Sequence, residues 1–202
     1  MTSSPADTNP ADEDGFRRSL ETNLGRVDQG ITAHSHLRDK FSRRAAALST
    51  VIIVAAAIVT VLATSSDTIK ELLFLSPSRA DQIVGLAGLV ALLLSILELK
   101  VGWREKSSRH AEAANSLSRL KLLIVRELGN DRALTKARYT ELHQAYEDVN
   151  DLITKIPESK FLELKAIHKR KVEMSKFLDT HPGSSIILLR IKIWLRDNIS
   201  WP

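Results

Sequence analysis

The sequence predicts an all-α membrane protein, with a two-span transmembrane helical hairpin, an N-terminal amphipathic helix and a C-terminal cytoplasmic helical domain. The first observation behind this prediction is that no charged residue lies within 45–66, and the second is that none lies within 82–97. About 20 helical residues cross the ~30 Å hydrocarbon core of a bilayer, and the second run reaches this length if it continues to Val101. The third is the chain length of 202 residues, which is too short to bury two helices that are apolar on every side. A buried helix pair in a soluble protein is therefore the less favoured alternative.

The composition argues against catalysis and against several kinds of bound group. The chain has no Cys, which excludes disulfides, thiolate catalysis and Cys-ligated zinc or iron–sulfur centres. It contains no Gly-rich phosphate-binding loop and no hydrolase or metalloprotease motif. His34 and His36 point about 200° apart on a helix, so they do not share one metal easily. We therefore expect no enzymatic activity, no cofactor and no metal site.

The N-terminal part divides into a tail and a helix. Residues 1–15 carry four acids and no bases, which predicts a disordered acidic tail. Residues 16–44 place apolar side chains three and four residues apart, which predicts a cytoplasmic amphipathic helix, although Gly25 and Gly30 weaken it. No Pro separates this helix from the first span, 45–66, so we expect one long helix through both. Its apolar-face positions are Phe16, Leu20, Leu24, Val27, Ile31, His34, Leu37 and Phe41.

Charges around the two spans predict the orientation. Basic residues outnumber acidic ones just before the first span and just after the second span, 82–101, whereas the connecting segment 67–81 has a net charge of −1. Positive residues stay on the cytoplasmic side, so we expect both termini in the cytoplasm. The segment 67–81 is then a short external loop containing Pro77, and residues 68–75 are expected in the outer interface. The basic flanking residues are Arg38, Lys40, Arg43, Arg44, Lys100, Arg104, Lys106 and Arg109.

Residues 102–202 predict a cytoplasmic helical region for oligomerisation and regulation. The helical pattern continues past the second span to Leu128, Gly129 is a stop signal, and Asn130 or Asp131 is the expected N-cap of the next helix. That helix carries an apolar seam of near-heptad spacing, which is suited to contacts between subunits. The seam residues are Leu142, Tyr146, Val149, Ile153 and Ile156.

The rest of this region contains two clear breaks and one ambiguous segment. Pro157 interrupts the pattern, and we expect a further helix over 158–179 that ends at a break over 181–183. The segment 184–199 fits both a strand alternation and one face of a helix. We favour a short basic amphipathic helix on the inner membrane surface or against a neighbouring subunit. A strand that pairs between subunits is the alternative.

Small and polar residues share one face of the second span. Ala87, Ala91 and Ser95 are four residues apart and Glu98 follows three later, a spacing that lets helices approach closely. We favour a packing face, and the alternative is a pore-lining stripe, with Thr60 of the first span as a further pore-lining candidate. Two helices cannot enclose an aqueous path, so a channel requires a homo-oligomer around an axis.

Basic clusters follow the second span. Residues 102–202 hold 19 Lys and Arg against 13 Asp and Glu, which attracts either the anionic inner leaflet or a polyanion such as an oligonucleotide. We favour the lipid interpretation. Aromatic residues make up only 5% of the chain, few for base stacking, and we expect no sequence-specific binding of duplex DNA. The candidate polyanion-binding residues are Arg119, Lys121, Arg126, Lys169, Arg170 and Lys171.

Three segments give the chain a family resemblance. They are LRDKFSRRAAALSTVIIVAAAIVTVL, ELKVGWREKSSRHAEAANSLSRLKLLI and ARYTELHQAYEDVNDL. Their order and spacing over roughly residues 20–180 resemble the SLATT family, the SMODS- and SLOG-associating two-transmembrane effector domains of bacteria. His110, Ala113, Leu117 and Leu120, which follow the second span, contribute to the resemblance.

The resemblance implies a function that composition and periodicity do not show. SLATT proteins are regarded as pore-forming effectors of bacterial anti-phage, abortive-infection systems. The resemblance therefore implies an oligomeric channel controlled by a nucleotide or oligonucleotide signal from a partner nucleotidyltransferase, or by a sensor protein. The alternative is a non-conducting, membrane-anchored scaffold that recruits a cytoplasmic partner.

Overall fold

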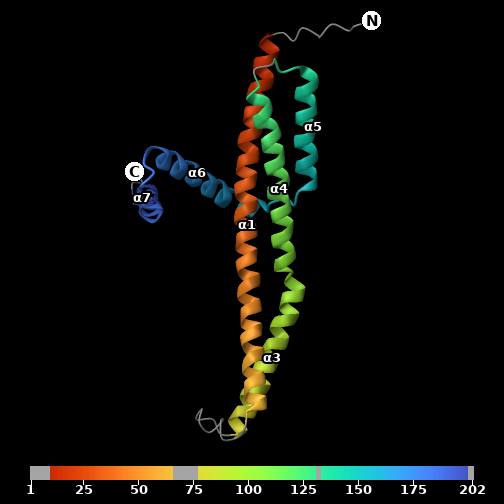
Figure 1. Cartoon of the computed structure of the whole chain (residues 1–202), viewed down its shortest axis with the longest axis vertical. Coiled ribbons are helices and arrows are strands. Elements are labelled where there is room, and N and C mark those ends of the chain that lie inside the picture. The colour runs from red at the N-terminus through yellow and green to blue at the C-terminus, as the bar shows by residue number, and fades with distance from the viewer. Residues whose placement is uncertain (1–9, 66–76, 131–132, 200–202) are drawn as a thin grey trace. The chain divides into compact units, whose positions relative to one another are not determined.

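The computed structural model describes residues 10–65, 77–130 and 133–199, and every regular element in these ranges is an α-helix (Figure 1). The chain forms two compact units, one from residues 1–36 with 110–202 and the other from residues 37–109. The helices are α1 (Pro10–Thr64), α3 (Pro77–Val101), α4 (Trp103–Leu128), α5 (Lys136–Leu152), α6 (Glu158–Thr180) and α7 (Ile186–Ile199).

Helix α1 continues without a break from the amphipathic region into the first apolar run, as the lack of Pro predicts. It starts at Pro10, so the prediction of disorder is wrong for residues 10–15, and residues 1–9 lie outside the described ranges. Glu13 explains the early start, since its carboxylate accepts the Leu134 backbone N–H at 3.1 Å and the Arg17 guanidinium at 3.0 Å. Both hydrogen bonds lower the pKa of Glu13, and the one from the Leu134 N–H has the larger effect.

The first unit is built around a core shared by α1, α4 and α5. Buried positions of α1 recur at alternating spacings of three and four, at Leu20, Asn23, Val27 and His34, which is the spacing of coiled-coil packing. Gly30 continues this series, and a Cβ on it would lie 3.0 Å from Leu117 Cδ1. The fully buried core residues are Leu20, Val27, Leu117, Leu120, Ile124, Leu134 and Leu142.

The seam of α5 packs inside the chain. Leu142 belongs to the shared core, and Tyr146, Val149 and Ile153 pack against it. These four residues therefore pack in the core that α5 shares with α1 and α4 of the same chain. An apolar seam of this spacing can pack against any helix that carries a similar seam, and α1 and α4 are two such helices in the same chain.

The joint between α4 and α5 differs from prediction in its cap. Helix α4 ends at Leu128, directly before Gly129, as predicted. The N-cap of α5 is Thr135, whose hydroxyl accepts the Arg138 N–H, and not Asn130 or Asp131. Leu134 must enter the core before α5 starts, which moves the cap beyond the first suitable residue.

Helices α6 and α7 form a packed pair at the C-terminal end of the first unit. Pro157 caps α6, and α6 ends at Thr180, one residue beyond its predicted limit. Helix α7 occupies most of the ambiguous segment 184–199, so the strand alternative is wrong. On α6, His168 Nδ1 lies 3.1 Å from the Thr32 hydroxyl of α1, which ties the pair to the rest of the unit.

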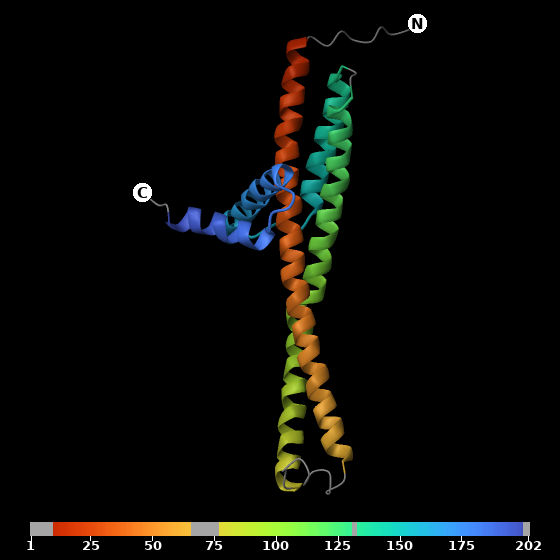
Figure 2. The same ribbon diagram turned by 60° about the vertical axis from the view of Figure 1, so that its left-hand side comes forward.

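The second unit contains the two apolar runs. Helix α3 lies beside the C-terminal half of α1 in both views (Figures 1 and 2). Pro77 is the first residue of α3, a favoured place for Pro, so residues 77–81 of the predicted loop are helical. The remainder of that loop, residues 67–76, lies outside the described ranges together with Ser66. The second predicted span ends as expected at Val101.

A glycine separates α3 from α4. Gly102 has a φ of 60°, in the left-handed region that Gly adopts without steric strain because it has no Cβ. The Gly102 N–H bonds to Glu98 O at 3.1 Å, and its carbonyl accepts the Lys106 N–H at 3.0 Å. The helical pattern therefore changes direction here with its hydrogen bonds continued on both sides, an interruption that the apolar periodicity does not predict.

Candidate functional site

Helices α1 and α3 pack against each other through one row of less exposed residues on each helix. Along each row, successive residues are three or four positions apart in the sequence, and almost all the residues at the intervening positions are exposed. The spacing is that of left-handed coiled-coil packing. The row on α1 is Ala45, Leu48, Ile52, Ala55, Val59 and Leu62, and the row on α3 is Val84, Ala87, Ala91, Leu94 and Glu98.

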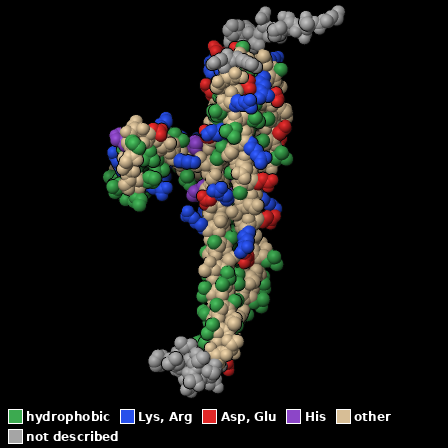
Figure 3. All heavy atoms as spheres, viewed as in Figure 1, with side chains coloured by type: hydrophobic (Ala, Val, Ile, Leu, Met, Phe, Trp, Pro, Cys, Tyr) green, Lys and Arg blue, Asp and Glu red, His purple; other side chains and the backbone are tan. Residues whose placement is uncertain are grey.

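The outward surface of this helix pair is apolar. Ile53 is 67% exposed, Leu86 64% and Leu92 58%, although none of them has a polar group to offer water. The visible face of this part of α1 and α3 carries hydrophobic side chains and few charged ones (Figure 3). Both apolar segments are long and apolar enough to cross a membrane.

The predicted pore-lining residues divide between the packed row of α3 and the exposed surface. Ala87 and Ala91 lie in the row that meets α1, whereas Ser95 and Thr60 are exposed. The Ser95 hydroxyl donates to Ala91 O at 2.8 Å, and the Thr60 hydroxyl donates to Ala56 O at 2.9 Å. Each hydroxyl is thus satisfied by its own helix, a common way to carry a hydroxyl through lipid.

Glu98 lies in a small polar cluster at the charged end of the apolar pair. Its carboxylate lies 3.2 Å from Arg104 Nε and accepts the Ser49 hydroxyl at 3.3 Å. The Arg104 guanidinium also donates to Ser49 Oγ at 2.6 Å. The cluster joins α1 to both sides of the Gly102 break, and it gives the carboxylate a counter-charge within the same chain.

A histidine pair forms a buried polar contact between α1 and α4 in the first unit. His34 of α1 is 1% exposed and His110 of α4 is 6% exposed, with 2.9 Å between their Nδ1 atoms. One ring donates its Nδ1 proton to the other, so the ring that accepts is neutral in this arrangement. Burial, and then the proximity of His110, lowers the pKa of His34 to about 4, and burial also lowers the pKa of His110.

The predicted polyanion-binding residues fall on two helices. Arg119, Lys121 and Arg126 belong to α4, where Lys121 is paired with Asp28 at 2.7 Å. The other three, Lys169–Lys171, are consecutive on α6 and therefore point about 100° apart, so they do not converge on one ligand. Of the six, Arg170 alone lines a pocket between α6 and α7.

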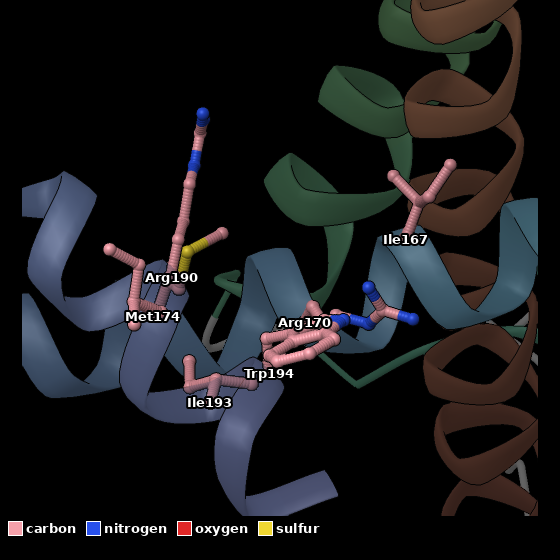
Figure 4. Close-up of a pocket in the computed structure, with 7 residues that line it drawn as sticks. Ile167, Arg170, Met174, Arg190, Ile193 and Trp194 are labelled. Atoms are coloured by element: carbon pink, nitrogen blue, oxygen red, sulfur yellow. The ribbon is translucent and has the colours of Figure 1, made fainter. Parts of the chain in front are cut away.

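The pocket between α6 and α7 has a volume of about 420 Å³ (Figure 4). Its lining is mostly apolar, and the guanidinium groups of Arg170 and Arg190 are placed at separate edges in Figure 4. Among the described residues, neither group is paired with a carboxylate. The residues lining it are Ile167, Arg170, Met174, Arg190, Ile191, Ile193 and Trp194.

Sequence reasoning placed His34 on an apolar face and His110 in the helical pattern after the second span, but it did not join them. The pairing depends on how α1 and α4 pack, and the available signal was two His at seam positions of two helices. It also missed Arg190 and Trp194 as residues that line a pocket, because a groove between two helices has no signature in one segment. In comparisons with protein-family models, curated proteins and solved structures, no match to this chain was found.

Proposed function

We propose that the chain crosses the bacterial inner membrane twice, through the C-terminal part of α1 and through α3, with both termini in the cytoplasm. The observation that carries this proposal is the exposed apolar surface of both helices, which water would solvate poorly and lipid solvates well. The basic residues that flank the two segments support the orientation.

Within the membrane, we propose an oligomeric channel that acts as an effector of anti-phage, abortive infection. A single pair of helices has no room for an aqueous path, so conduction requires several copies. The hydroxyls of Thr60 and Ser95 are exposed and can face a shared axis, and Glu98 is the only carboxylate of the second span. The resemblance to SLATT effectors supports this reading.

Reconstitution into liposomes tests conduction directly. The full chain is expected to dissipate a potassium diffusion potential, and Glu98→Gln is expected to change the rate or the ion preference. Glu105→Gln is the matched control, because Glu105 is an exposed carboxylate in the first turn of α4. Liposomes that hold their potential at every protein density, with and without nucleotides, would exclude the channel.

The signal is proposed to be a nucleotide or oligonucleotide from a partner nucleotidyltransferase, received directly or through a sensor protein. The exposed cations Arg119, Arg126 and Lys169 support direct electrostatic attraction. Adding cyclic and linear oligonucleotides to the flux assay at several salt concentrations tests it. An effect on flux that weakens with salt is expected, and flux that no nucleotide alters at low salt would exclude direct reception.

A non-conducting scaffold is the second candidate, and one observation favours it. The hydroxyls of Thr50, Thr60 and Ser95 are bonded within their own helices, and Glu98 has Arg104 as its partner, so the apolar pair needs no aqueous environment. Replacing both apolar segments by unrelated spans of equal length separates the candidates. A scaffold retains its cellular effect after this exchange, whereas a channel loses it.

A further inference from the structure

The outer surface of α7 is an apolar face bordered by basic residues. On the inner side, Leu189 and Ile193 are each 5% exposed where α7 meets α6. On the outer side, Ile187 is 70% exposed and Trp194 55%. At 100° per residue, Arg190 and Lys192 fall on the two borders of this outer face. The other outer-face residues are Leu188, Ile191, Leu195 and Ile199, together with the polar Asn198. Ile191 and Trp194 lie at the edge where this face meets the α6–α7 pocket, because they also line the pocket.

The charges of the α6–α7 pair are unequally compensated. The Arg196 guanidinium bonds to both Glu173 and Asp197, and these contacts raise its pKa while Arg196 lowers that of Glu173. Arg170 and Arg190 at the α6–α7 pocket have no carboxylate partner among the described residues. The segment 158–199 holds nine Lys and Arg against five Asp and Glu. The pocket edges therefore carry positive charge that is not neutralised within this pair of helices.

We infer that the α6–α7 pair binds anionic phospholipid. The outer face of α7 enters the boundary between headgroups and acyl chains, acyl carbons occupy the apolar pocket, and Arg170 and Arg190 each bind a lipid phosphate. Apolar burial combined with cationic borders is how interfacial helices bind membranes. Guanidinium groups suit phosphates because they donate in a planar fork. The inference rests on the proposed membrane location and is separate from conduction.

Charge complementarity favours lipid over a second copy of the chain. A two-fold contact through this face would bring a basic border of one copy against a basic border of the other copy, which is unfavourable. An anionic leaflet supplies the opposite charge and the apolar phase together.

The test measures quenching of Trp194 by lipids brominated near the top of the acyl chains. The full chain with Trp103→Phe and Trp201→Phe is reconstituted into phosphatidylcholine vesicles with or without phosphatidylglycerol. Strong quenching is expected with phosphatidylglycerol. Arg170→Gln with Arg190→Gln should lower the ratio of docked to undocked α7 about 30-fold, because each basic residue near an anionic surface contributes about 1 kcal/mol and 1.4 kcal/mol is a factor of ten.

A matched pair of variants separates the pocket from diffuse charge. Lys171→Gln with Lys176→Gln removes the same charge from exposed positions of α6 that do not line the pocket. This control is expected to lose clearly less quenching than the arginine variant. Equal losses would overturn the phosphate-binding role of Arg170 and Arg190.

A second reporter separates failure of docking from failure of membrane insertion. With Trp194→Phe and Trp201→Phe, Trp103 reports the end of the second apolar segment. Quenched Trp103 with unquenched Trp194 in phosphatidylglycerol overturns the inference while the membrane proposal stands. Quenched Trp194 with unquenched Trp103 supports lipid docking and overturns the proposed spans, and two unquenched reporters overturn both.

Discussion

Lowering the pH from 7.5 to 5 is expected to destabilise the unit that contains the His34–His110 pair by about 2 kcal/mol. The unfolded imidazole titrates near 6.5, whereas burial lowers the pKa of His34 in the folded chain to about 4. Between pH 6.5 and pH 4, the His34 imidazole is protonated in the unfolded chain but mostly unprotonated in the folded chain. The folding free energy that His34 contributes above pH 6.5 is therefore lost progressively as the pH falls to 4. The magnitude follows from these two pKa values, at about 1.4 kcal/mol per pH unit. The lowered pKa of His110 acts in the same direction.

Thermal unfolding of the full chain in detergent is the assay. A loss of about 2 kcal/mol should lower Tm by about 4–8 °C in a chain of this size. His34→Gln with His110→Gln is expected to remove most of that pH dependence, since neither amide titrates. His181→Gln is the matched control, because His181 is exposed and stacked on Phe177. Measurement stops at pH 5 because the lowered pKa of Glu13 contributes only in stronger acid.

The double variant decides whether the reasoning is right. If its Tm falls between pH 7.5 and 5 as steeply as that of the unchanged chain, other groups carry the acid response and the histidine argument is refuted. A steeper fall in the His181→Gln control than in the double variant would refute it as well.

Two further comparisons test the packing by thermal unfolding. Gly25→Ala is expected to stabilise the chain by up to about 1 kcal/mol, because its Cβ meets open space and Ala favours a helix. Gly102→Ala should instead cost about 1–2 kcal/mol because of the positive φ, and equal effects of the two changes would contradict this. Ile124→Ala should cost about 2–5 kcal/mol, since Ile124 is fully buried in the core. Leu152→Ala, at a position 86% exposed, should stay within about 0.5 kcal/mol.

The helix boundaries that sequence reasoning located correctly are those fixed by local chemistry. Gly129 ends α4, Pro157 precedes α6, and the break over 181–183 separates α6 from α7. Each depends on a conformation that one or two residues impose regardless of their surroundings. The N-cap at Thr135 could not be located in this way, because Leu134 is drawn into a core formed by distant segments.

The candidate site was less predictable, because its contacts join segments far apart in the sequence. From the sequence alone, Gly30 is a residue that weakens a helix, but in the structure its missing side chain leaves room for Leu117 of α4 to approach α1. His34 and His110 are 76 residues apart in the chain and meet only when these helices pack. In the same way, periodicity put Ala87 and Ala91 on one face, but only packing identifies the neighbour of that face as α1.

The satisfied polar groups of the apolar pair constrain how a channel can work. The Glu98 carboxylate is ion-paired with Arg104 and accepts a hydrogen bond from Ser49, and its side chain lies in the row that packs against α1. A conducting assembly that uses this carboxylate must rotate α3 or separate Glu98 from Arg104. The Gly102 break gives α3 a point about which to turn, whereas α1 has no equivalent. Conduction through Glu98 therefore requires movement of α3 relative to α1. A reducible cross-link between the facing rows of α1 and α3, which include Ala55 and Ala91, should abolish flux, and reduction of the cross-link should restore it.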